Sequence, residues 1–322
     1  MNKNELNAAL ERCFTEDANV EVYLGIKEKG FRKARFENDV QKKVASMYQN
    51  ELAEKLLNND EANLTAYSAY EGRTKDWAEF DLEMPEDLNF FDELMRLNEV
   101  EGFSFENDGL DNIESMVIVI GNAEARVGIY KRMASINIFT KNKGLFVRKG
   151  DNGFVSSDIN FLRITNGIDL MKINGSLLIA NISVLEKFFN ITDVVSRAAT
   201  SEIGKIAELG IVSDTVKLTE IAEELRYARK LAKISETSPV IRKGISAAQI
   251  RHFAESFQYP QFNTLRFDEE DRLCLTSKKS AQIFIKLLND DYLSSELTES
   301  HYDSAVKEEV QKRHRVSSYI WP

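Results

Sequence analysis

The sequence predicts an α+β protein with a mixed α/β N-terminal part, followed by an antiparallel β-meander and a helical C-terminal part. Three observations support this class: strand and helix patterns alternate before residue 115, strand patterns follow one another up to 181, and helical spacing follows. The 322 residues, 43% of them apolar, suffice for two domains. We expect an acidic α/β domain at 1–114 and a β-meander plus helical domain at 115–322.

The first part mixes both element types. Residues 19–26 alternate and contain β-branched side chains, which predicts a strand, and the apolar spacing of 36–57 predicts a helix. Pro85, followed by two acids, is typical of a helix N-terminus, because proline suits the first helical position and acids face the positive end of the helix dipole. That helix is expected to extend to about Asn98.

Strand patterns begin at residue 115, with strands predicted at 116–120, 126–130, 135–140 and 145–148. Two Asn-Gly pairs follow, at 166–167 and 174–175, and both residue types tolerate the positive φ of type I′ turns. We therefore expect a three-stranded meander formed by 161–165, 168–173 and 176–181.

Helical patterns dominate the remainder, and helices are predicted at 184–189, 193–209, 214–234, 247–257 and 278–288. Two of them begin with capping boxes, Ser183 with Glu186 and Ser246 with Gln249. A hairpin is expected between 265–267 and 272–275.

Several classes of protein are excluded or disfavoured. Cys13 and Cys274 stand far apart, which excludes a disulfide framework and a Cys-based zinc site and favours a reducing cytoplasm. The longest uncharged run, 173–185, has 13 residues, whereas a membrane span needs about 20. Glu5 precedes any apolar segment at the start, so we expect neither a signal peptide nor membrane insertion.

No motif for catalysis or for a cofactor is present. The phosphate-binding patterns G-x-x-x-x-G-K-[ST] and G-x-G-x-x-G do not occur, and the three histidines are too scattered for a multi-histidine metal centre. We expect no cofactor and assign no catalytic residue. Asp290, Asp291 and Glu296 could supply oxygens for Mg²⁺, although residues directly after a helix more often form turn and cap bonds.

Charge is sorted along the chain. The net charge of −10 argues against a general nucleic-acid binder, yet residues 1–124 carry 13 Lys and Arg against 28 Asp and Glu, a net charge of −15. The remainder is therefore +5. Residues 125–150 hold seven bases and no acid, and 226–251 form a second basic block. Such sorting is typical of a domain boundary or a two-faced surface, but acidic and basic blocks can also neutralise each other inside one fold.

The basic blocks contain the candidate DNA-binding residues. Four cations of the predicted helix 214–234 share one face, because they stand at i, i+3, i+4 and i+7: Arg226, Arg229, Lys230 and Lys233. The other candidates are Arg242, Lys243, Lys141, Lys143, Arg148 and Lys149. Together they could neutralise several phosphates. Alternatively, the helix face is merely solvated and pairs with glutamates of its own helix. Tyr130, Phe139 and Phe146, interleaved with the strand cations, could stack bases or belong to the core.

A string near the C-terminus, LLNDDYLSSELT at 287–298, resembles the C-terminal signature of the KwaB family, the soluble components of the two-protein Kiwa anti-phage defence system. Tyr302 and Lys307 follow it, and the order of elements is also similar over roughly 110–310. The matching positions, to which no role is carried over, are Asp290, Asp291, Tyr292, Ser295, Glu296 and Thr298.

The resemblance implies a defence effector that binds DNA without sequence preference and acts with a membrane protein similar to KwaA to block phage DNA replication. We further expect a cytoplasmic homodimer or higher homo-oligomer, recruited to the inner membrane by its partner, whose acidic first part is a protein-interaction surface. Two alternatives remain open: a metal-dependent nuclease that uses the C-terminal carboxylates, and a scaffold that binds only protein.

Overall fold

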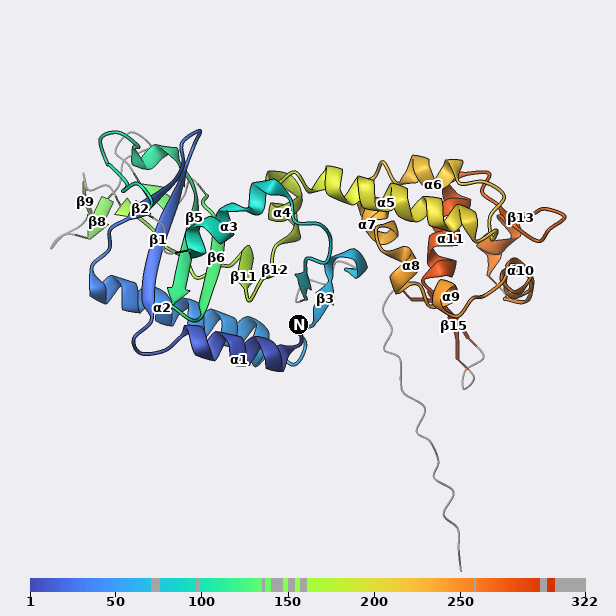
Figure 1. Ribbon diagram of the computed structural model, residues 1–322, viewed down its shortest axis with the longest axis horizontal. Coiled ribbons are helices and arrows are strands. Elements are labelled where there is room, and N and C mark those ends of the chain that lie inside the picture. Colours follow the sequence, from blue (N-terminus) through green and yellow to red (C-terminus); the bar gives the residue numbers. More distant parts are fainter. Residues whose placement is uncertain are drawn as a thin grey trace, which may run out of the picture. The chain divides into compact units, whose positions relative to one another are not determined.

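A computed structural model describes residues 1–70, 76–96, 99–134, 137–139, 147–149, 154–156, 161–257, 259–295 and 300–304 (Figure 1). Its contacts divide the chain into two compact units, Met1–Arg197 and Ala198–Pro322. Helices and strands are both abundant, and the helices dominate the second unit. The predicted α+β class is confirmed.

The first unit is built around an eight-stranded sheet with the order β2-β1-β5-β6-β11-β12-β4-β3. Neighbouring strands are antiparallel, except that β3 and β4 are parallel. In sheet order the strands are Gly30–Ala34, Asn19–Ile26, Ile113–Gly121, Arg126–Arg132, Leu170–Ile173, Ser176–Ile179, Trp77–Glu79 and Leu64–Ala66. Small two-stranded sheets pair β7 (Ile138–Phe139) with β10 (Phe161–Leu162), and β8 (Val147–Lys149) with β9 (Phe154–Ser156).

The domain boundary expected after residue 114 falls inside strand β5. This strand pairs with β1 along its length, with Val22 opposite Ile118. Residues before and after position 114 therefore share one sheet, and the contacts place the division later, after Arg197. The acidic composition of the first part therefore ends within a single sheet and does not mark a domain boundary.

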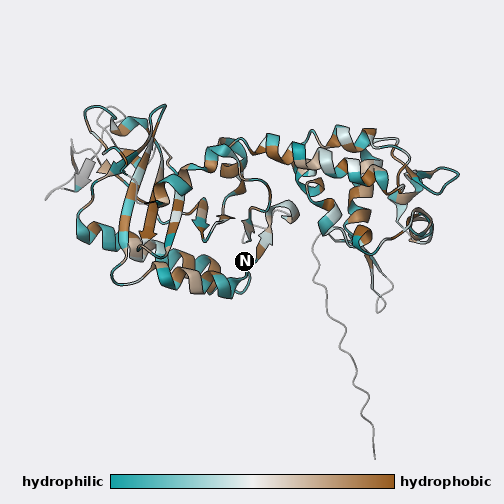
Figure 2. Cartoon of the chain, viewed as in Figure 1, coloured by the Kyte–Doolittle hydropathy of each residue, from teal (hydrophilic) through white to brown (hydrophobic). Residues whose placement is uncertain are grey.

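Alternation along the strands places two sets of side chains on opposite faces of the sheet. The helices of this unit are α1 (Lys3–Cys13), α2 (Asn38–Leu52, continued by a π turn over Ala53–Leu57), α3 (Phe90–Met95) and α4 (Ile182–Phe188). On one face, Val22, Ile118 and Ile129 join Leu10 of α1 and Tyr48 of α2 in a buried cluster. Figure 2 shows hydrophobic and hydrophilic residues alternating along α1 and α2, as expected of helices with one buried face.

On the opposite face, α3 approaches β6 at Gly128. A Cβ atom at this position would lie 2.9 Å from the Met95 sulfur and 3.0 Å from the Phe91 ring, so a larger residue would force these side chains to shift. The helix expected over 85–98 is shorter than predicted: a 3₁₀ turn at Glu86–Leu88 precedes α3. Residues 97 and 98 lie outside the described part.

The expected three-stranded meander is wrong in its first strand. The turn at Asn174 (φ 49°) and Gly175 (φ 81°) joins β11 and β12 as predicted. The other neighbour of β11 is β6, however, and β10 pairs with β7 instead. Local turn signals identify hairpins, whereas the pairing of β11 with β6 joins distant segments that no local pattern records.

The second unit is mainly helical. Its helices are α5 (Ile191–Glu208, which contains the division between the units), α6 (Val216–Ile221), α7 (Leu225–Leu231), α8 (Ile234–Thr237), α9 (Pro239–Arg242), α10 (Ala247–Ser256) and α11 (Lys278–Leu288). Two short hairpins complete it, β13 (Arg266–Phe267) with β14 (Leu273–Cys274), and β15 (Tyr292–Ser294) with β16 (His301–Asp303). The predicted α11, the 266–274 hairpin and the Ser246–Gln249 capping box are confirmed.

The single helix expected over 214–234 is instead three short helices. The chain leaves the helical conformation at Glu224, whose φ and ψ are −86° and 115°. Glu220, Glu223 and Glu224 stand three and four residues apart, a like-charge spacing that disfavours a continuous helix here. Within the described residues, no helix combines the length and the apolar character needed to cross a membrane.

Candidate nucleic-acid interface

The four cations predicted to share a helix face do not share one. Arg226 on α7 is exposed, and its guanidinium carbon lies 4.7 Å from the ring centroid of Tyr227. Arg229, one turn later, is only 8% exposed. Its side chain belongs to the interior of the second unit, so the prediction of a surface role for Arg229 is wrong.

Lys230 and Lys233 follow Arg229 and are both half-buried. Lys233 precedes α8 with a non-helical φ of −137°, and its ammonium lies 3.3 Å from Glu236. The break between α7 and α8 therefore removes the i+7 relationship on which the shared face depended. The alternative of pairing within the segment is realised for Lys233, whose partner is Glu236.

Arg242 and Lys243 form an exposed pair of adjacent cations at the end of α9. The helix begins at Ser238, whose hydroxyl oxygen accepts a hydrogen bond from the Ile241 N–H at 3.1 Å. Gly244, with φ of 62°, ends the segment immediately after the pair. The cap at Ser238 and the positive φ of Gly244 thus define the two ends of the short segment that presents this pair.

Of the four strand cations predicted, Lys141 and Lys143 lie outside the described residues. Arg148 lies in β8, and Lys149 ends that strand with an exposed side chain. Among the aromatic residues considered for base stacking, Tyr130 is 3% exposed and packs against Phe189 with ring centroids 5.4 Å apart. Tyr130 is therefore a core residue, and burial raises its pKa.

Beside Tyr130, β6 ends in two cations that have carboxylate partners. Asp169 is 2% exposed, and its carboxylate accepts hydrogen bonds from the Arg132 backbone N–H (2.7 Å), Lys131 Nζ (3.3 Å) and Asn181 Nδ2 (3.0 Å). The Arg132 guanidinium lies 3.5 Å from Glu114. Lys131 thus balances a buried charge, whereas Arg132 remains partly open to solvent.

Two residues of the C-terminal string, Asp291 and Tyr292, are buried in the second unit. Asp290 follows α11 with φ of 57°, and Asp291 is 2% exposed. Tyr292 is 4% exposed and packs against Phe262 and Tyr259, with ring centroids 4.8 and 5.3 Å away. Burial raises the Tyr292 pKa. Asp290 therefore lies in a turn directly after α11, the role that its position in the sequence suggested.

Ser295 directly follows β15 in the hairpin formed by β15 and β16. The Ser295 N–H donates to the Ser300 carbonyl oxygen at 2.9 Å, while Glu296 and Thr298 lie outside the described residues. No group of three or more His, Cys, Asp or Glu side chains arranged to hold a metal ion occurs within the described ranges.

A cavity of about 600 Å³ opens in the second unit beside these aromatic residues. Phe257, Tyr259 and Phe262 contribute to its lining together with the Glu255 carboxylate. The described lining residues include no lysine or arginine that could hold phosphate. We therefore do not assign the cavity to the nucleic-acid interface.

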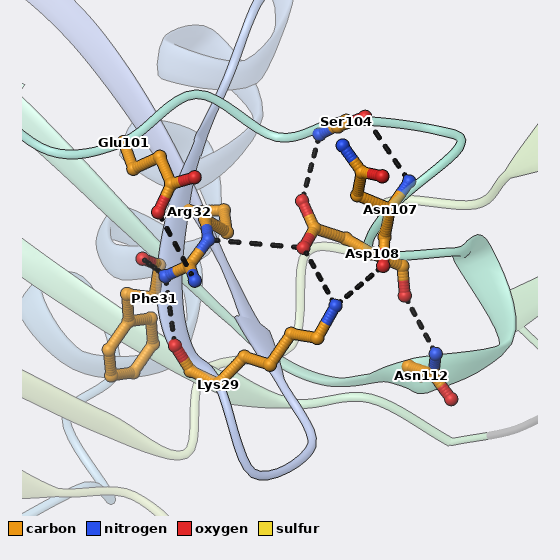
Figure 3. A network of polar contacts seen from close by, with 8 residues as sticks. All are labelled: Lys29, Phe31, Arg32, Glu101, Ser104, Asn107, Asp108 and Asn112. Atoms are coloured by element: carbon orange, nitrogen blue, oxygen red, sulfur yellow. Dashed lines mark hydrogen bonds and ion pairs between the residues drawn. The ribbon is translucent and has the colours of Figure 1, made fainter.

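The acidic first part is partly neutralised by its own cations. Figure 3 shows the Asp108 carboxylate, which is 6% exposed, between Lys29 Nζ at 3.5 Å and Arg32 Nε at 3.9 Å. The Ser104 N–H donates to its other oxygen at 2.8 Å. This backbone hydrogen bond, with help from Lys29 and Arg32, holds the Asp108 pKa below its ordinary value. The network fastens the 101–112 loop to the hairpin formed by β1 and β2.

The structural units change the meaning of the charge sorting. Residues 198–322 carry 18 Lys and Arg against 19 Asp and Glu, a net charge of −1. Residues 125–197 carry 11 bases and 5 acids, a net charge of +6. The basic excess therefore belongs to the same unit as the acidic 1–124 segment. The domain boundary predicted after residue 114 lies too early in the chain to show that these two segments share one unit.

Comparison with known proteins identifies the family. A family model described as Kiwa protein KwaB-like matches residues 110–298, more than half of the chain. The chain belongs to the KwaB family. The matched span agrees with the resemblance seen in the sequence, and membership of the Kiwa system assigns this KwaB family member to anti-phage defence. A Kiwa component also implies a protein partner.

A curated relative extends the similarity to the acidic first part. The Kiwa protein KwaB of Escherichia coli O55:H7 is 24% identical over 317 residues, which cover 97% of this chain and 100% of the relative. The alignment with this relative therefore includes most of the acidic first part. No solved structure matches the chain.

Proposed function

We propose that this KwaB family member binds DNA without sequence preference and acts with a membrane protein similar to KwaA to block phage DNA replication. The observation that supports DNA binding best is the +6 charge of residues 125–197. Lys149, Arg163 and Lys187 present exposed side chains in this segment. Cations that reach phosphates bind any sequence, because the backbone charge is the same at every base pair.

A second group of cations supports the same activity from the other unit. Arg242 and Lys243 are exposed and adjacent, and Arg226 is exposed on α7. These residues, with Lys230, Arg148 and the positions 141 and 143, are the contacts we propose. Arg229 is not among them, because its side chain is buried.

The acidic first part suits a protein partner better than DNA. Residues 1–124 carry 28 Asp and Glu against 13 Lys and Arg, and Glu101 and Glu106 are exposed in the loop before β5. Surface carboxylates repel phosphate, so this part favours a protein partner over DNA. We propose that this part contacts the membrane partner or a second copy of the chain. The protein would then work in the cytoplasm, as a homo-oligomer recruited to the inner membrane.

Fluorescence anisotropy with a labelled duplex of random sequence, measured over a range of salt concentrations, tests DNA binding. We expect the logarithm of the affinity to fall linearly with the logarithm of the salt concentration, by about 0.9 for each phosphate contacted. A second random duplex should bind equally. Absence of binding at low salt would exclude the proposed activity.

Incubation of the protein and plasmid DNA with Mg²⁺ or Mn²⁺ separates binding from cleavage. We expect the plasmid to be shifted and to remain intact. Appearance of nicked or linear plasmid, lost on Asp290→Asn or Glu296→Gln substitution, would support the nuclease alternative. A protein that neither shifts nor cleaves the plasmid, but co-purifies with a co-expressed KwaA-like protein, would be the scaffold.

A further inference from the structure

A phenylalanine ring lies on the surface of the first unit between two cations. Phe188, the last residue of α4, is 39% exposed. The Arg132 guanidinium carbon lies 4.2 Å from the centroid of this ring, and Lys187 Nζ lies 5.3 Å from it. A large apolar side chain is thus kept at the surface, with positive charge on adjoining elements.

The neighbouring core fixes the position of this ring. Phe189, the next residue, has left the helical conformation, with φ and ψ of −129° and 138°. Its side chain is buried against Tyr130 and Phe90, with ring centroids 5.4 and 6.1 Å away. Because Phe189 is anchored in the core, Phe188 is held outside it. The exposed ring is therefore preorganised, and a ligand that stacks on it loses little protein entropy.

Arg132 is held with comparable firmness. It ends β6, and its backbone N–H donates to the buried Asp169 carboxylate at 2.7 Å. Glu114 is the carboxylate near its guanidinium, at 3.5 Å, and this acid is 41% exposed. A surface pair of this kind is weak and easily exchanged for a phosphate.

We propose that Phe188, flanked by Arg132 and Lys187, is a stacking site for an unpaired nucleobase, so that the DNA bound by this protein includes a single-stranded segment. The inference rests on the proposed DNA binding and names the form of DNA recognised. Proteins that bind single strands combine aromatic rings, on which bases stack, with cations that follow the backbone. Inside a duplex both faces of every base are covered by its neighbours, so a blunt duplex offers this ring only its two terminal pairs.

The same unit offers a matched control. Phe105 is 76% exposed and, like Phe188, contacts another side chain: the Phe103 ring, with centroids 5.2 Å apart. Its surroundings are acidic, with the exposed Glu101 and Glu106 in the same loop. Removal of either ring deletes an exposed phenyl group, but only the ring among cations is expected to affect DNA binding.

The test compares a labelled oligothymidylate with a blunt duplex of equal length, using fluorescence anisotropy with the full chain. Phe188→Ala should weaken oligothymidylate binding about 5-fold or more, and duplex binding less than about 2-fold. Phe188→Trp should retain oligothymidylate binding, and Phe105→Ala should change neither affinity. An oligonucleotide with a fluorescent base analogue should be quenched by the wild type and by Phe188→Trp, but less by Phe188→Ala.

Each contrary outcome has one meaning. Wild-type protein that binds the duplex but not oligothymidylate would overturn the stacking site and leave the proposed function intact, as would equal losses for Phe188→Ala and Phe105→Ala. Wild-type protein that binds neither DNA would overturn both proposals. If Phe188→Ala fails to fold, as judged by circular dichroism, the Phe188→Trp and Arg132→Gln variants are compared instead. Unchanged quenching in Arg132→Gln would overturn the flanking role of the arginine.

Discussion

The hydroxyl of Ser238, which caps α9, donates a hydrogen bond to the carbonyl oxygen of Leu288, the last residue of α11. Ser238 is completely buried. This contact joins the start of the helix that presents Arg242 and Lys243 to the start of the 287–298 string. The string is thereby connected by a buried hydrogen bond to the helix that carries this pair of cations.

Replacement of Ser238 by alanine should lower the free energy of unfolding by about 1–3 kcal/mol, because it removes a helix cap and leaves a buried carbonyl without its donor. Urea denaturation followed by circular dichroism measures the change. Ser201→Ala, on the exposed surface of α5, is the control and should cost less than about 0.5 kcal/mol. Equal effects of the two substitutions would show that the Ser238 contact contributes little.

Charge reversal at the two arginines of α7 should lower the stability of the protein by different amounts. Arg229→Glu places a carboxylate in the interior and should destabilise the protein by about 3 kcal/mol or more. Arg226→Glu alters an exposed side chain and should cost less than about 1 kcal/mol. Thermal denaturation of both variants distinguishes them. A stable Arg229→Glu variant would contradict the buried position of Arg229.

The exposed pair at the end of α9 should contribute to the salt dependence of DNA binding. The double variant Arg242→Glu and Lys243→Glu should weaken binding and reduce the salt slope by up to about 2, the expectation for two lost phosphate contacts. The matched control is Lys42→Glu with Lys43→Glu, an exposed lysine pair on α2 in the acidic first part. Equal losses in both double variants would mean that only net charge matters.

The Asp108 network should weaken in acid. Its pKa is lowered by the Ser104 N–H and by Lys29 and Arg32. The ionised carboxylate therefore stabilises the fold above the unfolded-state pKa of about 3.9, and this stability is lost as the pH falls through the lower folded pKa. The difference in melting temperature between wild type and Asp108→Asn should be full at neutral pH and shrink below about pH 4.

Asp60→Asn serves as the control for Asp108, because Asp60 is an exposed turn residue. It should change the melting temperature little at either pH. A difference between wild type and Asp108→Asn that stays constant down to strongly acidic pH would contradict the charge-based role of this network.

Local patterns predicted the local elements well. The strand at Asn19–Ile26, the Asn174-Gly175 turn and the Ser246–Gln249 capping box of α10 all follow from short-range rules of spacing, turn geometry and capping. The pairing of β11 with β6 could not be found in this way, because it depends on which distant strand offers a complementary buried face.

The candidate site was predicted less completely, for a related reason. A helical-wheel argument grouped Arg226, Arg229 and Lys233, but it holds only for an unbroken helix, and the end of α7 at Leu231 separates Lys233 from the two arginines. Phe188 carried no signal in the sequence, since an exposed and a buried phenylalanine read alike. Its setting depends on Arg132, which comes from a distant strand.

The affinity of the purified full chain for a random-sequence duplex, measured by anisotropy as the salt concentration is raised, tests DNA binding most directly. We predict tight binding at low salt that weakens linearly on logarithmic axes and is the same for unrelated sequences. A protein that leaves the duplex unbound at low salt, or whose affinity does not depend on salt, would contradict it.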